Sequence, residues 1–255
     1  MSVWDRYSSR VQVHGKTQRG AALRQDRRWL NSYMAASPSS HRIVIDNEET
    51  EAVILDSDNL NIKTICMYPG EPLKNGSLVL WNDQSWLVTE LDANNELYFR
   101  GVMQQCNYLL RWINADGKII ERWSIVEDGT KYLTGDYSDK DFVVTRGDSR
   151  ISLTLPKDEE TIRLERENRF IIDDYDATQP LAYKLTKPFK LGGTFNGEGV
   201  LRFVLTECNT EDTDNLQLHI PNYYKYFPRK ELVDGDISEV VPVIPDPPHG
   251  KESWL

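Results

Sequence analysis

The sequence predicts a mainly β protein: a small antiparallel β-barrel, then an immunoglobulin-like β-sandwich, with one N-terminal helix and an extended C-terminal tail. Three observations lead to this fold class. Apolar residues recur at helical spacing only near the start, short runs with two-residue alternation follow, and turn-forming residues separate those runs. Many short strands without intervening helices are typical of barrels and sandwiches.

The helix is expected over residues 17–37, TQRGAALRQDRRWLNSYMAAS. Thr17 can cap its start, and Ser37-Pro38 should end it because proline cannot continue the hydrogen-bond ladder. Helical spacing divides its side chains into an apolar side and a basic, polar side. The apolar side carries Ala22, Leu23, Trp29, Leu30, Tyr33 and Met34, and the other carries Arg24, Arg27, Arg28 and Asn31.

Strand-like runs begin at His41 and are separated by turn formers such as Asn82-Asp83. The runs read HRIVI, AVILD, LNIKTICM, SLVLW, SWLVTEL, ELYFRGVMQQCNYLLRWIN, KIIERWSIV, DFVVTR and RISLTL. In the longest run Cys106 is in phase with the core residues, so we expect its burial. Gly101 near a change of phase predicts a bulge, and Ala115-Asp116-Gly117 predicts a hairpin turn.

A second group of strands follows Pro156: TIRLERENRFIIDDYD, LAYKLTKPF, GTFNGEGVLRFVLTEC and LQLHI. Their length and spacing suggest a sandwich of immunoglobulin-like size. Leu201, Phe203 and Leu205 alternate with polar or smaller residues, which predicts one buried face. The glycine-rich run at 192–199 is interpreted as a loop, because no helix follows it to bind phosphate.

Four regions result from these patterns. Residues 1–42 are a basic arm that contains the helix, 43–155 a barrel, 156–224 a sandwich and 225–255 an acidic, proline-rich extended tail. The tail closes with the apolar pair Trp254-Leu255, which can dock on a neighbour or stay unbound.

Charge is distributed unevenly along the chain. The formal net charge is −10, yet the first 30 residues carry seven basic against two acidic side chains, a net +5 that leaves −15 on the other 225 residues. A basic arm on an acidic body often meets an acidic partner. A solvated helix face explains the same pattern, and the sequence leaves both interpretations open.

We find no catalytic constellation, cofactor motif or metal-ligand spacing, and therefore predict that the chain is not an enzyme. Cys66, Cys106 and Cys208 form no CxxC pair, the four histidines are dispersed, and the acidic stretch GDYSDKD does not match an EF-hand loop. No apolar run approaches the roughly 20 residues of a membrane-spanning helix. The N-terminus lacks a signal-peptide core, so we expect the chain to be made and kept in a cytoplasm without membrane association, unless it is carried out as part of a larger particle.

Three stretches resemble structural proteins of tailed bacteriophages and prophages of Gram-positive bacteria, specifically head-closure or neck connector proteins. They read GSLVLWNDQSWLVTELDANNELYFRGVMQQCNYLLRWINADGKIIERW, GDSRISLTLPKDEETIRLERENRFIIDD and LAYKLTKPFKLGGTFNGEGVLRFVLTE. The similarity covers about residues 43–224 and consists of strand and turn patterns, not of a catalytic signature.

The resemblance implies a virion protein at the head–tail junction. Copies would form a ring between a portal or adaptor protein above and tail proteins below, retaining packaged DNA and then letting it pass without sequence-specific binding. It implies no catalytic residues. The candidate interface residues are Arg24, Arg27, Arg28, Trp29, Leu30 and Met34 of the helix, with Trp254 and Leu255 of the tail; the arginines would meet acidic surface on an adjoining ring.

Two alternatives remain open. One is a tail-tip, baseplate or capsid-decoration protein whose second domain binds host carbohydrate through Tyr223, Tyr224 and Tyr226. The other is a β-rich hydrolase, which a carboxylate pair in a pocket would indicate.

Overall fold

The computed structural model describes residues 2–11, 17–92, 94–128, 150–172, 180–195 and 197–228. The chain forms two compact units. The first contains residues 1–81, 85–106 and 191–201, and the second contains residues 82–84, 107–190 and 202–255. Strands dominate both units, so the mainly β prediction is confirmed.

Two helices precede the first strand. α2 (Gln18–Ala35) confirms the predicted helix, and the Thr17 hydroxyl caps it by accepting a 3.1 Å hydrogen bond from the Gly20 N–H. α1 (Val3–Val11) was not predicted. The sequence does carry an indication of it, because Ser2 and Asp5 have capping-box spacing. The Asp5 carboxylate accepts from the Ser2 N–H at 2.8 Å, and the Ser2 hydroxyl accepts from the Trp4 N–H at 3.2 Å.

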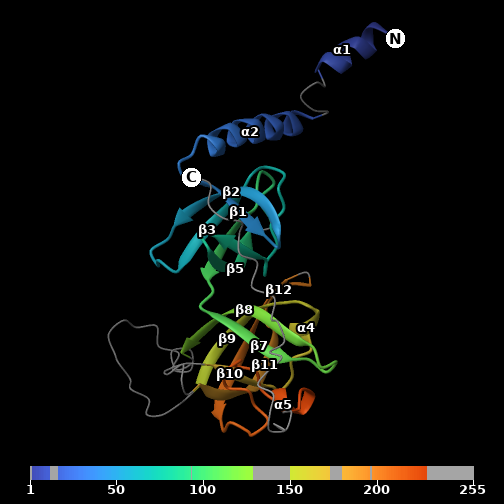
Figure 1. The fold of residues 1–255 in the computed structure, drawn as a ribbon. Helices are drawn as coiled ribbons and strands as arrows, with labels where there is room; N and C mark the ends of the chain where they lie inside the picture. The colour runs from blue at the N-terminus through green and yellow to red at the C-terminus, as the bar shows by residue number, and fades with distance from the viewer. Residues whose placement is uncertain are drawn as a thin grey trace, which may run out of the picture. The chain divides into compact units, whose positions relative to one another are not determined.

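Six antiparallel strands of the first unit close into a barrel in the order β1-β2-β3-β6-β5-β4 (Figure 1). They are β1 (Ser40–Ile45), β2 (Glu48–Asp56), β3 (Ile62–Met67), β4 (Leu78–Trp81), β5 (Gln84–Asp92) and β6 (Arg100–Gln105). Two-residue turns with positive φ at both positions, Asp46-Asn47 and Asn82-Asp83, link β1 to β2 and β4 to β5. The barrel interior holds Ile43, Ala52, Ile54, Ile65, Met67, Leu73, Val79, Trp86, Val88 and Met103.

The predicted bulge lies on the strand paired with Gly101, not on the strand that contains it. Val88 pairs with Met103 and Glu90 with Val102, so the register shifts on β5. A Cβ at Gly101 would lie 2.9 Å from the Glu90 carbonyl oxygen. Gly101 therefore supplies the space that the bulged strand needs.

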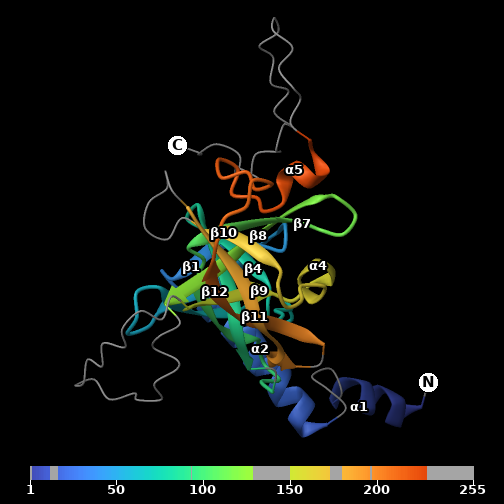
Figure 2. The ribbon, with the colours of Figure 1, turned by 90° about the horizontal axis from the view of Figure 1, so that it is seen from below.

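The second unit is built on one six-stranded sheet in the order β10-β11-β12-β9-β8-β7 (Figure 2). Its strands are β7 (Tyr108–Ile113), β8 (Ile119–Asp128), β9 (Arg150–Pro156), β10 (Arg169–Ile172), β11 (Leu181–Phe195) and β12 (Glu198–Cys208). The sheet curls until its edges meet: the Tyr108 hydroxyl donates to the Ile171 carbonyl at 3.2 Å, and Trp112 packs edge-on against Phe170. The unit is thus a barrel-like sheet, where the sequence suggested a two-sheet sandwich.

The chain leaves the barrel for the second sheet at Cys106-Asn107, not near residue 156 as predicted, and residues 191–201 return to the first unit. The long predicted strand ELYFRGVMQQCNYLLRWIN is in fact β6 of the barrel and β7 of the second sheet. The Cys106 N–H donates to the Ser85 carbonyl, whereas the Asn107 N–H donates to the Ser124 carbonyl. Residue alternation continues through the junction, so the pattern along the chain conceals the change of sheet.

Two further predicted strands differ. TIRLE forms the short helix α4 (Glu159–Ile162) and its exit, because Asp158 accepts from the Glu160 and Thr161 N–H groups as a cap. LQLHI contributes one bridge, Asn215 to Ile220. By contrast, the predicted buried face of Leu201, Phe203 and Leu205 and the hairpin turn between β7 and β8 are confirmed.

Candidate interface site

Helix α2 packs on the outside of its own barrel. β2 and β3 turn Ala52, Ile54, Ile65 and Met67 inward, so the cross-strand pair Val53 and Cys66 faces outward. Met34, only 5% exposed, covers this pair, and Leu30, Tyr68 and Tyr98 pack around it. This contact holds one side of α2 to the barrel.

Two arginines reinforce the attachment. Arg19 forms a 2.7 Å ion pair with the Glu96 carboxylate, and Arg27 donates to the Glu96 carbonyl oxygen at 2.6 Å. Both contacts are exposed, so each contributes little stability. The Arg19 contact shows that α2 accepts an acidic partner, Glu96, from its own chain.

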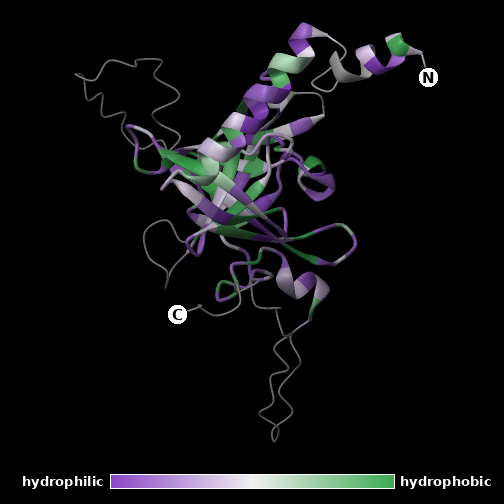
Figure 3. Ribbon diagram, turned by 90° about the horizontal axis from the view of Figure 1, so that it is seen from above, coloured by the Kyte–Doolittle hydropathy of each residue, from purple (hydrophilic) through white to green (hydrophobic). Residues whose placement is uncertain are grey.

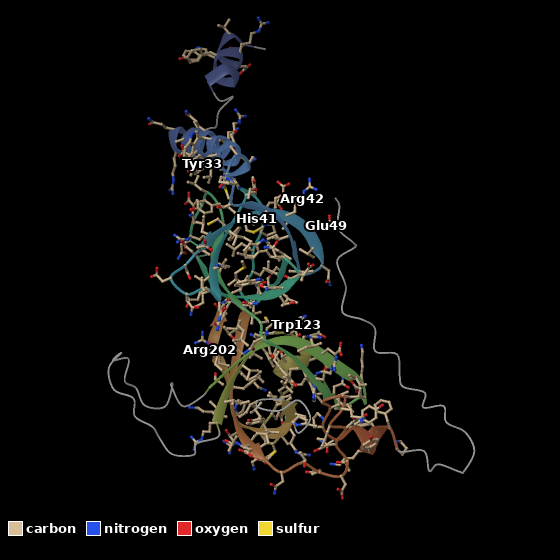
Figure 4. The ribbon with its side chains drawn as sticks, turned by 60° about the vertical axis from the view of Figure 1, so that its left-hand side comes forward. Tyr33, His41, Arg42, Glu49, Trp123 and Arg202 are labelled. Carbon is tan, nitrogen blue, oxygen red and sulfur yellow. The ribbon has the colours of Figure 1, made fainter. Side chains whose placement is uncertain are left out.

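Away from its barrel contact, α2 carries four exposed residues that we call the arm surface: Arg24 and Arg28 on one face, and Trp29 and Tyr33 on another face roughly 100° to 180° around the helix axis. The two rings are four residues apart and stacked, with centroids 5.3 Å apart and planes 14° apart, yet they remain 65% and 63% exposed. Arg24 and Arg28 are also four residues apart, so they share one face. Figure 3 shows hydrophilic and hydrophobic stretches along α2. Figure 4 labels Tyr33 on this helix.

A second aromatic pair is exposed on α1. Trp4 and Tyr7 meet edge to face with ring centroids 5.8 Å apart and are 75% and 60% exposed. The sequence analysis did not select these two residues, because it did not predict α1. The capping-box spacing at Ser2 and Asp5 would have indicated the helix and hence its aromatic face.

The predicted interface residues therefore fall into three groups. Arg24, Arg28 and Trp29 lie on the arm surface. Arg27 binds Glu96, and Leu30 and Met34 belong to the chain's own packing, so they are already occupied in the folded subunit. Trp254 and Leu255 lie outside the described residues.

All three thiols are free, and the two buried ones, Cys66 and Cys106, are poorly suited to nucleophilic chemistry. Burial raises the pKa of the Cys106 thiol to about 12 and also raises that of Cys66, where Arg100 partly offsets the effect. The reactive thiolate is therefore disfavoured at neutral pH. The predicted burial of Cys106 is confirmed. Within the described ranges no three His, Cys, Asp or Glu side chains gather as metal ligands, and no helix is long and apolar enough to span a membrane.

The second unit contains a cleft of about 440 Å³ with mixed charge. Trp112 and Asn114 of the β7 end line it, with Glu160 and Arg163 near α4 and with Asn222 and Tyr226 at α5 (Tyr223–Tyr226). Arg163 lies 3.7 Å from Glu160 and 3.8 Å from Asp116, so its charge is already balanced by carboxylates. Of the three tyrosines proposed to bind carbohydrate, Tyr223 is buried and Tyr224 half-buried, which leaves the Tyr226 ring exposed at this cleft.

Residues 6–105 match the family model described as the YomX N-terminal domain, a family of the Bacillus phage and prophage type. The matched region begins within α1 and ends at the last residue of β6, so it contains the second half of α1, all of α2 and the six barrel strands. No curated protein and no solved structure matches the chain. The similarity fits a phage-related protein, in agreement with the resemblance found from the sequence.

Proposed function

We propose that the chain is a structural subunit of the phage neck, a head-closure or head–tail connector that forms a ring between portal and tail. The ring retains packaged DNA and gives it passage, with a portal or adaptor protein on one side and tail proteins on the other. The subunit acts by packing against other proteins and needs no cofactor. The similarity of residues 6–105 to a phage-type domain supports this class of role.

The observation that carries the proposal is the arm surface on α2. The stacked Trp29–Tyr33 pair is costly to leave in water, and Trp, Tyr and the arginines on the other exposed face are residue types enriched at protein interfaces. The helix is held to the barrel by its other side, so the surface is presented on a rigid support. Its positive charge suits an acidic neighbour on the same or an adjoining ring.

The overall charge supports passage of DNA. A net charge of −10 repels phosphate, and a channel lined with like charge lets a duplex slide without adhering.

Immunogold labelling tests the location. An antibody against residues 156–224 would be applied to purified particles of the phage that encodes the chain and viewed by electron microscopy. Gold at the head–tail junction is the expected result. Gold at the tail tip or over the capsid, or particles that lack the protein, would contradict the neck role.

Charge reversal tests the interface. The double variant Arg24→Glu/Arg28→Glu should fold normally, since neither side chain forms a hydrogen bond or ion pair within the part of the chain that the structure describes, and should block joining of heads to tails. The matched control is Arg166→Glu/Arg202→Glu, which makes the same charge change at two exposed positions, one between α4 and β10 and one on β12 (Arg202, Figure 4). If Arg24→Glu/Arg28→Glu still gave normal infectious particles, the assignment of these arginines to the interface would be wrong.

The alternative role is a tail-tip, baseplate or capsid-decoration protein that binds host carbohydrate. One observation favours it: the cleft of the second unit combines the exposed Tyr226 ring with the amides of Asn114 and Asn222. Binding of the purified protein to host glycans that Tyr226→Ala abolishes would support this role, and gold at the head–tail junction would oppose it.

A further inference from the structure

We infer that helix α1 of one copy docks on the barrel of a second copy, over the part of the outer barrel surface that α2 leaves uncovered. The partner is therefore this same protein, and every copy offers both the helix and the surface that receives it. The inference rests on the proposed function for its biological meaning, since it names a contact that would link neighbouring copies of the ring.

The apolar side of α1 has no cover. Val3, Trp4 and Tyr7 are 84%, 75% and 60% exposed, and their spacing places them within about 100° around the helix axis. The rings of Trp4 and Tyr7 meet edge to face, so they present one continuous aromatic surface. Aromatic side chains on one side of an amphipathic helix are typical anchors for an apolar surface of a partner.

The barrel presents such a surface on β2, β3, β6 and the turn between β2 and β3. We call it the uncovered face: Leu55, Leu60, Ile62, Thr64 and Val102. Ile54, Ile65 and Met103 lie in the barrel interior. The residues beside them in sequence therefore point outward, and Leu55, Thr64 and Val102 form one cross-strand row.

Helix α2 covers only the neighbouring row of this outer surface. Met34 packs on Val53 and Cys66, which lie two residues along the strands from Leu55 and Thr64. Leu55 stays 42% exposed and Leu60 79% exposed. Apolar side chains therefore remain in water next to α2, on strands that α2 itself uses as its support.

The helix and the uncovered face match in size. The nine residues of α1 rise roughly 13.5 Å, and three neighbouring strands spaced about 4.8 Å apart are roughly 10 Å across. Packed helices lie about 8–10 Å apart, whereas rows two residues apart along a strand are about 6.7 Å apart. A second helix laid beside α2 would therefore lie over the uncovered face.

The docked helix comes from another copy. α1 and the uncovered face belong to the same compact unit, yet the apolar side chains of both are exposed in the single chain, so α1 does not cover its own barrel. A helix on one part of a subunit and its receiving surface on another part make a head-to-tail contact. Such contacts close into a ring when the rotation between copies permits it.

Charge favours the same pairing. α1 carries two arginines and one aspartate, whereas the turn between β2 and β3 carries Asp56 and Asp58. Lys63 pairs with Asp56 at 2.6 Å, but Asp58 is exposed and forms no ion pair within the residues that the structure describes. An arginine of the docked helix can pair with Asp58, which would orient the helix more than it would add affinity.

Photo-crosslinking of the purified full-length chain tests the inference. Tyr7 is replaced by photoreactive p-benzoylphenylalanine, and equal amounts of ¹⁴N- and ¹⁵N-labelled chain are mixed at roughly 1 mM, because a contact of such small area is weak. Mass spectrometry then identifies the crosslinked peptides and their isotopes. We expect crosslinks from position 7 to peptides of the uncovered face, with mixed-isotope pairs as frequent as same-isotope pairs.

Variants give the expected contrast. Leu55→Lys and Leu60→Lys should each lower the crosslinked fraction about tenfold, because lysine removes apolar area and repels a basic helix. The matched control Leu216→Lys changes a leucine of the second unit that is 40% exposed, and it should leave the fraction unchanged. The same crosslinker at Ser9, about 200° around α1 from position 7, should label the uncovered face less. Circular dichroism of each variant checks the fold.

Four results would overturn the inference: no crosslinks, crosslinks that avoid the uncovered face, crosslinks only within one isotope, and crosslinks that persist unchanged in both lysine variants. The third result would assign the uncovered face to the chain's own α1. The experiment uses no phage particle, so its failure leaves the head–tail location to be decided separately by immunogold labelling. Gold away from the head–tail junction would conversely refute the neck role and leave the contact between copies standing.

Discussion

At the scale of single residues, three glycines let two backbone segments of the first unit touch. Gly76 has φ +90°, and a Cβ there would lie 2.1 Å from the Gly199 carbonyl oxygen; a Cβ at Gly199 would lie 2.0 Å from the Gly193 carbonyl oxygen. The Asn75 amide donates to that same Gly193 carbonyl at 3.4 Å. The glycine-rich run that was interpreted as a loop is in fact the end of β11 and the start of β12, and its glycines have a packing role, since only glycine fits so close an approach.

We predict that Gly76→Ala destabilises the chain more than Gly70→Ala does. Gly70 has a similar φ of +103° but nothing within 4 Å of a new Cβ, so its substitution costs only the left-handed conformation, about 1–2 kcal/mol. Gly76→Ala adds a backbone clash worth roughly 1–3 kcal/mol. Urea denaturation compares the two midpoints. Equal midpoints would show that the Gly76–Gly199 contact relaxes freely.

A second residue-scale prediction concerns the thiols. Burial raises the pKa of Cys106 from 9.0 to about 12, so its folded thiol stays neutral where the unfolded thiol ionises. The contribution of this neutral thiol to the free energy of unfolding is therefore fully present below pH 9, and it is lost as the pH rises toward 12. At pH 8 we expect the half-buried Cys208 to react first with a disulfide reagent, and Cys66 and Cys106 to react only on unfolding. A fast thiol that survives Cys208→Ser would contradict this order.

At the scale of elements, α2 is divided into an attached and a free side. Periodicity predicted the helix and grouped Trp29, Leu30, Tyr33 and Met34 on one apolar side. The structure separates this group: Leu30 and Met34 contact the barrel, while Trp29 and Tyr33 point away from it. Neighbouring positions on a helix differ by about 100°, so a wide apolar stripe can serve two surfaces.

We predict opposite effects for two truncations of α2. Met34→Ala should loosen the helix, because it removes the side chain that covers Val53 and Cys66, and a buried Met→Ala change costs about 2–5 kcal/mol. Trp29→Ala should leave folding stability nearly unchanged but weaken assembly. Hydrogen exchange of the α2 amides measures the difference: faster exchange is expected for Met34→Ala alone. The same protection in both variants would refute the division.

At the scale of the whole molecule, charge separates the arm from the rest. The first 30 residues carry +5 within a chain of −10. Such a balance steers the arm toward acidic partners and keeps the body away from phosphate. The proposed neck role uses both properties, one for joining proteins and the other for passing DNA.

We predict that the purified chain binds duplex DNA only weakly. At physiological salt the dissociation constant should exceed about 100 μM, weaker than typical non-specific binders, because a net −10 protein gains little from counterion release. Fluorescence anisotropy with a random duplex measures this. Arg24→Glu/Arg28→Glu should change it little, and micromolar binding would oppose passage without adhesion.

The sequence by itself determined what depends on neighbours along the chain. The period of apolar residues gave α2 and most strands, and the turn formers gave the β7–β8 hairpin and the Asn82-Asp83 turn. The charge count gave the basic arm. These features follow from local backbone preferences, which a short window of residues contains.

Tertiary structure alone decided which distant segments pair and which faces become covered. It divided the long predicted strand at Cys106, closed the second sheet on itself, and fixed Arg27 on Glu96 while leaving Arg24 and Arg28 exposed. Sheet partners and covered helix faces depend on contacts between residues far apart in sequence. The alternation of a strand and the spacing of a helix are the same whichever strand or surface the segment packs against. These patterns therefore do not identify the packing partner.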